Sequence, residues 1–245
     1  MRVSSTLPAR EHWQAVLDAA SEPYRQVGHL PWRFARGKLG FDPVFQHLLS
    51  QGLIAPRARV LDVGCGPGLL ASLLRACTLL AQQGRWPSQW AAAPAAAHVT
   101  GIDLRSRDIE RAKASLGDAA EFVCGDMRQV PFPEADTVVL LDVLHYINVA
   151  EQNEVLARVR RALPPDGTLL LRVGDATARL GFRFSQWVDT IVAWVRTRRV
   201  VPLSGRPLAA WVAQLESLGF EVRSQPMSQG TLFSNVLLVA KVRAV

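Results

Sequence analysis

Apolar runs and helically spaced segments alternate along most of this 245-residue chain. Five short strand-like runs have the length of buried strands: 59–63, 99–103, 120–124, 137–141 and 168–173. Three segments with apolar positions at helical spacing lie between them: 69–82, 108–115 and 150–163. This alternation predicts a doubly wound α/β fold built on a parallel sheet.

The C-terminal part departs from this alternation. A helix over 208–218 is predicted to end at Gly219, because glycine is the usual residue just after a helix. Two more strands, 220–224 and 236–242, follow with only a polar loop between them. A join without a helix makes the pair antiparallel. The sequence therefore predicts a seven-stranded, mostly parallel, Rossmann-like sheet with an antiparallel C-terminal hairpin.

Three segments lie outside this sheet. Residues 1–50 look helical, and residues 176–206 hold a Trp-rich helix over about 184–199. Both are expected to cover the open end of the sheet, where ligands bind in such folds. The third segment, 84–97, holds two prolines and two tryptophans and is interpreted as a loop insertion. The predicted organisation has four parts: a helical cap (1–50), a core (51–175), a cap insertion (176–206) and a completing helix and strand pair (207–245).

The composition is that of a globular protein, with 49% hydrophobic and 20% charged residues. The length suits one domain with a full-sized core. No stretch reaches the roughly 18 apolar residues of a membrane-spanning helix. Residues 1–10 are polar and lack the apolar centre of a signal peptide. We therefore expect a cytoplasmic protein without a transmembrane segment.

The net charge of +7 favours anionic partners. The arginines and lysines are spread along the chain, which argues against a nucleic-acid-binding protein. The three cysteines, Cys65, Cys77 and Cys124, are an odd number without paired metal-ligand spacing. We expect neither a disulfide framework nor a metal site. Each cysteine is expected to be a small buried apolar residue.

A glycine-rich segment directly follows the first predicted strand. Gly64, Gly66 and Gly68 alternate with other residues, and Asp62 stands two places before the first glycine. A nicotinamide fingerprint needs its third glycine three places after the second, where this chain has Leu69. The segment resembles motif I of class I methyltransferases, which implies S-adenosylmethionine as the cofactor. Asp62 has a second interpretation, that it holds the turn by accepting backbone N–H bonds.

Acidic residues follow three further strands in the order such a site requires. Asp103, with Leu104 beside it, is placed to accept the ribose hydroxyl protons. Asp126 suits the adenine amino group, and Met127 can pack on the ring. Asp142 can contact the amino group of the cofactor's methionine part. The alternative is a set of ordinary turn glycines and strand-end acids.

The segment before the first strand mixes aromatic and cationic residues. Arg36 or Lys38 could bind the cofactor's carboxylate or an anionic group of the substrate, and Tyr24 or Trp32 could line the pocket. The alternative is a solvated helical lid with a few anchoring aromatics. These four residues are the predicted substrate-binding set.

His145 and Tyr146 follow the fourth strand, where the methyl group would be delivered. His145 is the candidate general base, and Tyr146 is the second candidate catalytic residue. Both also suit a packed pair that holds the loop. Methyl transfer mainly requires alignment of the acceptor, and a base is needed only when the acceptor carries a proton.

Three arginines crowd the last turn of the predicted Trp-rich helix: Arg196, Arg198 and Arg199. Cations at that end suit the helix dipole. The alternative is docking of an acidic carrier protein or weak contact with an anionic membrane surface.

Several runs resemble methyltransferases of bacterial aryl polyene and xanthomonadin-type pigment clusters: 34–45, 84–87, 141–147, 171–175, 226–230 and 235–238. This resemblance implies methylation of a phenolic head group, free or presented as a thioester on an acyl carrier protein, in secondary metabolism. For methylation at carbon, it implies a base such as His145 that forms the phenolate.

Rival functions remain open at this point. The first is a methyltransferase that acts on another small acceptor, such as a carboxylic acid, a quinone precursor or an amine. A binding subunit without turnover is the second. An amino-methylating enzyme of nucleic acids is disfavoured, because the chain lacks an Asn/Asp-Pro-Pro-aromatic run after residue 141. A dehydrogenase is disfavoured by the glycine spacing.

Overall fold

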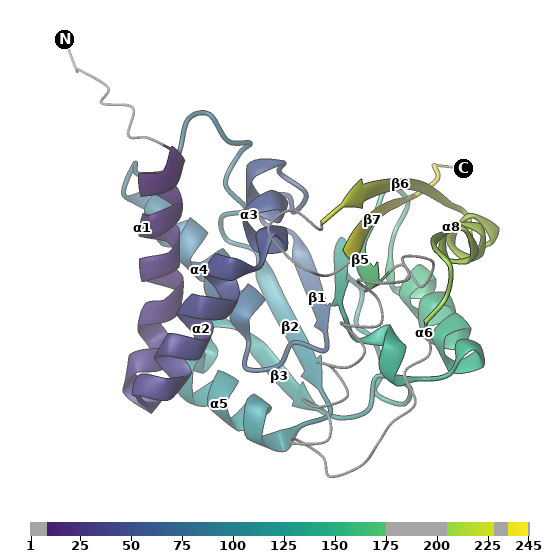
Figure 1. The fold of residues 1–245 in the computed structure, drawn as a ribbon, viewed down its shortest axis with the longest axis horizontal. Coiled ribbons are helices and arrows are strands. Elements are labelled where there is room, and N and C mark those ends of the chain that lie inside the picture. Colours follow the sequence, from purple (N-terminus) through teal and green to yellow (C-terminus); the bar gives the residue numbers. More distant parts are fainter. Residues whose placement is uncertain (1–8, 175–204, 228–234, 245) are drawn as a thin grey trace. The chain divides into compact units, whose positions relative to one another are not determined.

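The computed structural model describes residues 9–174, 205–227 and 235–244. The predicted helix over 184–199 and its arginines lie outside these ranges. Hydrogen-bonded strands form a seven-stranded sheet of order β3-β2-β1-β4-β5-β7-β6 (Figure 1). β7 is antiparallel to both β5 and β6. The predicted mostly parallel, Rossmann-like sheet with an antiparallel C-terminal hairpin is confirmed.

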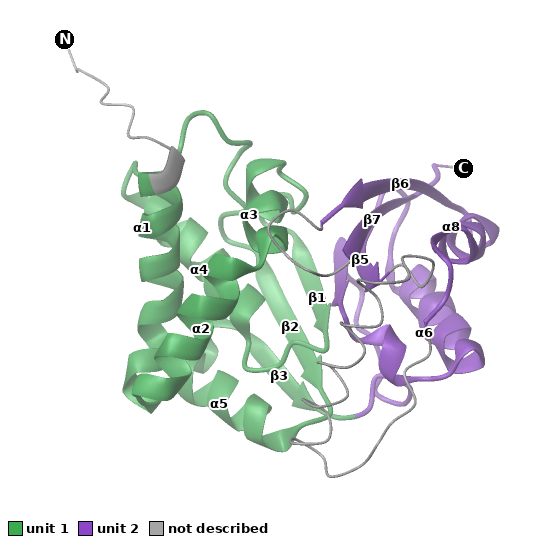
Figure 2. Cartoon of the chain, in the orientation of Figure 1, with its two compact units in different colours: residues 1–125 green, residues 126–245 purple. Residues whose placement is uncertain are grey.

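Contacts within the chain cluster in two compact units, 1–125 and 126–245 (Figure 2). The described helices and strands of the first unit run in this order: α1 (Ala9–Ser21), η1 (Glu22–Val27), α2 (His29–Phe41), α3 (Pro43–Ser50), β1 (Arg59–Val63), α4 (Leu69–Gln82), β2 (His98–Asp103), α5 (Ser106–Leu116), η2 (Gly117–Ala119) and β3 (Glu121–Cys124). β1, β2 and β3 are parallel. The described residues 9–50, which precede β1, are mostly helical.

The N-terminal helices are fixed to α4 through buried contacts. Nine of the 14 residues of α4 are buried, as expected of a helix enclosed on most sides. The Ser72 hydroxyl of α4 donates to the Ala20 carbonyl of α1 at 2.6 Å, which satisfies two buried polar groups. In α3, Asp42 caps the helix by accepting from the Val44 N–H at 3.2 Å, and Pro43 occupies the first helical position.

The 84–97 insertion is a loop, as predicted, and it is anchored by tryptophans. Trp86 donates its indole N–H to the Ala91 carbonyl at 2.9 Å. The Trp86 and Trp90 rings lie 5.5 Å apart edge to face, and Trp90 lies 6.3 Å from Trp13 of α1. Such aromatic pairs add to the stabilisation by area burial. The insertion is therefore fastened to the first helix.

The cysteine prediction is correct for two residues and wrong for the third. Cys65 and Cys77 are buried, whereas Cys124 is exposed. Cys124 lies on β3, the strand at one end of the sheet, and three of its four residues are exposed. An edge strand has neighbours on one side only, which explains the exposure of this thiol.

The second unit contains these described elements: β4 (Thr137–Leu141), η3 (Leu144–Tyr146), α6 (Val149–Ala162), β5 (Thr168–Gly174), α8 (Leu208–Ser217), β6 (Phe220–Pro226) and β7 (Asn235–Val242). β4 and β5 are parallel, and all but the last residue of β4 are buried. α6 begins with a capping box in which Asn148 and Glu151 each accept the other's backbone N–H. Among the described residues, no helix is long and apolar enough to cross a membrane.

Candidate cofactor site

The glycine turn between β1 and α4 has three glycines with positive φ: Gly64 (80°), Gly66 (53°) and Gly68 (79°). A Cβ on Gly66 would meet no heavy atom of the described residues within 4 Å. A Cβ on Gly68 would lie 2.9 Å from the Phe122 ring and 3.1 Å from Leu116. Gly66 therefore leaves open space where a ligand can approach the backbone, whereas Gly68 allows β3 and α5 to pack against the turn.

Asp103, the last residue of β2, is hydrogen-bonded to this turn. Its Oδ2 accepts from the Gly66 N–H at 2.8 Å, and its Oδ1 accepts from the Arg105 N–H at 2.9 Å. A carboxylate has about four acceptor positions, so capacity remains for ribose hydroxyls. Leu104 beside it is 68% exposed. The structure thus brings together two of the predicted cofactor-binding groups, the glycine turn and the acid of the second strand.

Asp62, at the penultimate position of β1, is buried. Burial, together with the negative charge of Asp103, raises the pKa of its carboxyl to about 7. The acceptor of the Gly66 N–H is Asp103. At the Gly66 N–H, it is therefore Asp103 that holds the backbone of the turn, a role that the sequence also allowed for Asp62.

Tyr24 is buried in η1, and its hydroxyl donates to the Pro67 carbonyl of the glycine turn at 2.9 Å. Burial raises the pKa of this phenol far above its ordinary value, so it stays a protonated donor. Cys65, in the same turn, packs closely against Gly101 of β2. A Cβ on Gly101 would lie only 2.8 Å from the Cys65 Sγ. The turn is therefore held from the N-terminal helices on one side and packed against β2 on another.

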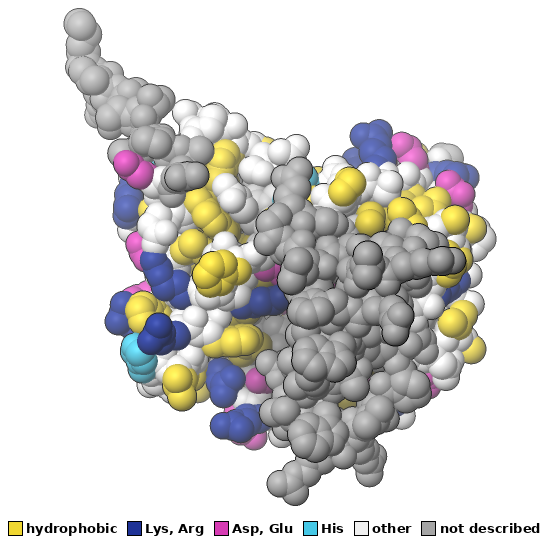
Figure 3. Space-filling view, viewed as in Figure 1, with side chains coloured by type: hydrophobic (Ala, Val, Ile, Leu, Met, Phe, Trp, Pro, Cys, Tyr) yellow, Lys and Arg dark blue, Asp and Glu magenta, His cyan; other side chains and the backbone are white. Residues whose placement is uncertain are grey.

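The other predicted substrate-binding residues lie on α2. Arg36 pairs with Asp18, and Lys38 pairs with Asp42 at 2.8 Å. Trp32 is half-buried, with the Arg25 guanidinium 4.1 Å from its ring centroid. The helix also exposes three large apolar residues: Leu30, Phe34 and Phe41. Figure 3 shows cationic and apolar side chains mixed on the visible face of this unit. Roles in substrate binding stay predictions.

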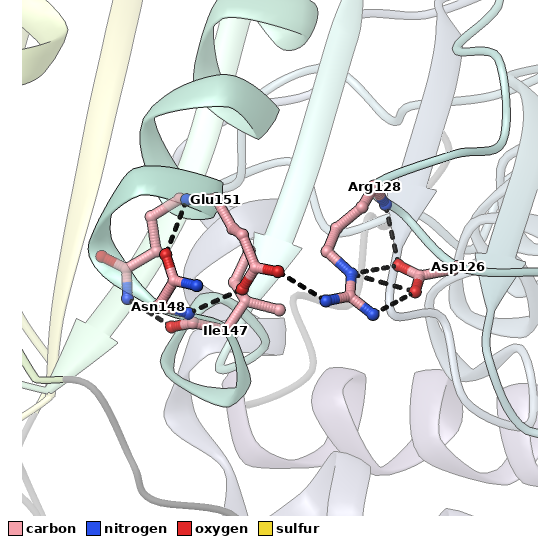
Figure 4. A network of polar contacts seen from close by, with 6 residues as sticks. Asp126, Arg128, Ile147, Asn148 and Glu151 are labelled. Carbon is pink, nitrogen blue, oxygen red and sulfur yellow. Dashed lines mark hydrogen bonds and ion pairs between the residues drawn. The ribbon is translucent and has the colours of Figure 1, made fainter.

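In the second unit, the predicted adenine acid is held by an arginine (Figure 4). Asp126 accepts from the backbone N–H of Arg128 at 2.9 Å and from its guanidinium Nε at 2.9 Å. These hydrogen bonds lower the pKa of Asp126, so the carboxylate stays ionised. Arg158 of α6 donates to the Met127 carbonyl at 2.6 Å and to the Val130 carbonyl. The loop of the predicted adenine subsite is therefore fixed by two guanidinium groups.

Asp142 follows β4 with a positive φ of 58°, which is uncommon for a residue with a side chain. Its Oδ1 accepts from Nε of Arg172 at 2.9 Å, and its Oδ2 accepts from Nη2 of the same buried residue. This fork-shaped pairing fixes the carboxylate, whose side chain is 34% exposed. The predicted contact with the cofactor's amino group stays a prediction.

His145 and Tyr146 lie together in η3, with ring centroids 4.2 Å apart and ring planes at 49°. His145 is half-buried, and Tyr146 is 39% exposed. This geometry matches the packed-pair interpretation. It is also compatible with a base role, which stays a prediction.

Comparisons with known proteins match this architecture. Residues 60–167 match the family model described as a methyltransferase domain. The matched part of the chain is therefore similar to methyltransferase domains. It contains the glycine turn, Asp103, Asp126, Asp142 and His145.

Two curated relatives cover part of the chain. A sterol 24-C-methyltransferase from Gibberella zeae is 28% identical over 64% of this chain and 39% of its own length. A carboxy-S-adenosyl-L-methionine synthase from Chromohalobacter salexigens is 33% identical over 49% of this chain and 43% of its own length. The chain thus spans about two fifths of the length of these relatives.

The fold of the chain also resembles that of solved structures. An O-methyltransferase family protein from Burkholderia thailandensis has a TM-score of 0.59 and 20% identity, over 96% of this chain and 69% of that one. Identity at this level shows the shared fold.

Sequence reasoning missed three arginines: Arg128 and Arg158 within the matched part of the chain, and Arg172 on β5. Arg172 had a visible signal, because a lone cation inside an apolar strand must find a carboxylate. Arg128 is only two positions from Asp126, but its contact with Glu151 and the contacts of Arg158 depend on how the loop after β3 packs on α6.

Proposed function

We propose that the chain binds S-adenosylmethionine and transfers its methyl group to a small-molecule acceptor. The observation that carries this proposal is the hydrogen bond from the Gly66 N–H to the Asp103 carboxylate. It holds an acid with spare acceptor capacity beside a glycine whose side-chain direction is open. A ribose ring needs this combination of close backbone approach and hydroxyl acceptors.

We assign the parts of the cofactor to the predicted residues. The glycine turn would bind the methionine part, and Asp103 with Leu104 would bind the ribose. Asp126 would accept from the adenine amino group, and Met127 would pack against the ring. Asp126 supports its assignment by staying ionised, because a carboxylate needs its charge to accept strongly from an amino group.

When bound, S-adenosylmethionine supplies an electrophilic methyl group on a cationic sulfur. The acceptor would attack the methyl carbon in line with the bond to the sulfur, which leaves. The protein's task is to align the acceptor and exclude water. His145 would take the proton of a phenolic acceptor as its oxygen attacks, or beforehand if a ring carbon is methylated. Tyr146, whose ring packs against His145, would orient the imidazole.

The acceptor that we propose is a phenolic head group, free or carried as a thioester on an acyl carrier protein, in pigment or other secondary-metabolite synthesis. The resemblance to pigment-cluster methyltransferases supports this choice. The apolar and cationic side chains that α2 exposes also suit an aromatic acceptor with an anionic group or carrier. Carboxylic acids, quinone precursors and amines are the alternative acceptors.

The test is S-adenosylhomocysteine formation with a panel of phenolic acids, offered free and as carrier-protein thioesters. We expect turnover with a phenol, and loss of at least about 100-fold in kcat for His145→Ala, in line with typical general-base contributions. Arg223→Met, an exposed substitution on β6, should leave turnover unchanged. Cofactor binding without turnover of any acceptor would instead favour a binding subunit.

A further inference from the structure

Arg128 contacts the predicted adenine acid with both its backbone and its side chain. Oδ1 of Asp126 accepts from the Arg128 backbone N–H at 2.9 Å and from Nε at 3.0 Å. Oδ2 accepts from Nε at 2.9 Å and from Nη2 at 2.5 Å. Three N–H groups of one residue therefore fix this carboxylate in position.

The same guanidinium reaches the start of α6 (Figure 4). Nη1 of Arg128 donates to Oε1 of Glu151 at 2.6 Å. Oε2 of Glu151 accepts from the Asn148 N–H at 3.0 Å within the capping box. Arg128 thus ties the Asp126 loop to the first turn of a helix, two residues after η3.

We propose that Arg128 is a positioning residue of the adenine subsite, which presents the ionised Asp126 carboxylate to the adenine amino group and is itself anchored by Glu151. This inference rests on the proposed function. It assigns to Arg128 a role in cofactor affinity that acts through Asp126.

The hydrogen-bonding capacity of Asp126 supports this role. A carboxylate has about four acceptor positions, and Arg128 fills three of them with its backbone N–H, Nε–H and Nη2–H. About one position remains, which suits one N–H of an adenine amino group. The arginine leaves the acid able to bind one more donor in a fixed direction.

A role in fold stability explains the network less well. The Arg128 side chain is 42% exposed, and exposed ion pairs contribute little to stability. The Glu151 side chain is 29% exposed, and its capping bonds are made with Asn148 and do not involve Arg128. Arg128 can therefore be replaced without unfolding the chain, which makes its role in binding measurable.

The experiment is calorimetric titration of the full chain with S-adenosylhomocysteine and with adenosine between pH 4 and 8. The variants are Arg128→Met and Glu151→Gln, and Arg223→Met is the matched control, an exposed arginine paired with Glu221. Gln can keep the capping box while the charge is lost. Thermal unfolding of each variant shows that the fold is retained.

We expect Arg128→Met to lower the affinity for both ligands about ten-fold at pH 7, which is the effect of losing one hydrogen bond to a charged group. Glu151→Gln should weaken them about two- to three-fold, and Arg223→Met should match the unaltered protein. Arg128 lowers the pKa of Asp126. The loss of binding on acidification should therefore begin at higher pH in Arg128→Met, a change that a purely structural role would not produce.

Equal or tighter binding by Arg128→Met would overturn the inference, and tighter binding would show that Arg128 competes with adenine for Asp126. Unchanged affinity in Glu151→Gln would overturn the anchoring role. Failure of the unaltered protein to bind S-adenosylhomocysteine would overturn the proposed function, and this inference with it.

Discussion

Replacing Tyr24 with phenylalanine separates two roles for the same residue. The structure places its hydroxyl against the glycine turn, where it donates to the Pro67 carbonyl at 2.9 Å. The sequence predicts instead that Tyr24 lines the substrate pocket. Tyr24→Phe removes one oxygen atom and keeps the ring, so packing around the buried side chain is preserved.

The cost of this change follows from the lost hydrogen bond. A net hydrogen bond contributes about 1 kcal/mol, and leaving the Pro67 carbonyl without this donor brings the loss to about 1–2 kcal/mol. For a chain of this size, that lowers Tm by about 3–6 °C. Because Pro67 belongs to the glycine turn, we expect affinity for S-adenosylhomocysteine to fall by up to about ten-fold.

The assay combines urea unfolding with calorimetric titration of S-adenosylhomocysteine. Ser217→Ala is the matched control, because it deletes an exposed hydroxyl that bonds locally to the Gln214 carbonyl. Its stability should change by less than about 0.5 kcal/mol. Unchanged stability and cofactor affinity in Tyr24→Phe, with a raised KM for the acceptor, would refute the turn-holding role and support the pocket role.

Three further substitutions test the glycine turn and the strand that precedes it. Gly68→Ala should destabilise the protein by about 2–4 kcal/mol in urea unfolding, because its Cβ would clash with Phe122, and near-normal stability would contradict this. Gly66→Ala should lower the free energy of unfolding by only about 1 kcal/mol, yet weaken S-adenosylmethionine binding at least about ten-fold in calorimetry. Unchanged binding would show that the open space beside Gly66 is not the ligand site. Asp62→Asn should remove a pH dependence of the free energy of unfolding. The folded carboxyl, with its pKa of about 7, keeps a proton that the unfolded chain releases at about pH 4. The unaltered protein should therefore lose up to about 4 kcal/mol of stability as the pH rises from 4 to 7. Parallel urea-derived stability profiles of the two proteins across that range would contradict the raised pKa.

The periodicity of the sequence predicted the bounds of two heavily buried elements. α4 and β4 begin and end where their apolar patterns do, at 69–82 and 137–141. α6 begins one residue before its prediction, at Val149, because the capping box of Asn148 and Glu151 sets its start. That box is visible in the sequence as an Asn followed three residues later by a Glu, so the boundary could have been found.

Contacts between distant residues are what the sequence could not supply. Asp142 was recognised as a strand-end acid, but its partner Arg172 lies 30 positions away, and Glu151 lies 23 positions from Arg128. The burial of Tyr24 against Pro67 likewise joins residues 43 positions apart. Cys124 was mistaken for a core residue because a short apolar strand looks the same at the edge of a sheet as at its centre.

The most direct test of the central claim is calorimetric binding of S-adenosylmethionine, with S-adenosylhomocysteine and NAD as comparators and Asp103→Ala as the variant. We predict micromolar binding of the first two ligands and no binding of NAD. In Asp103→Ala this binding should be lost, because the acceptor of the Gly66 N–H and of the ribose hydroxyls is removed. No binding of S-adenosylmethionine, or preferential binding of NAD, would contradict the account.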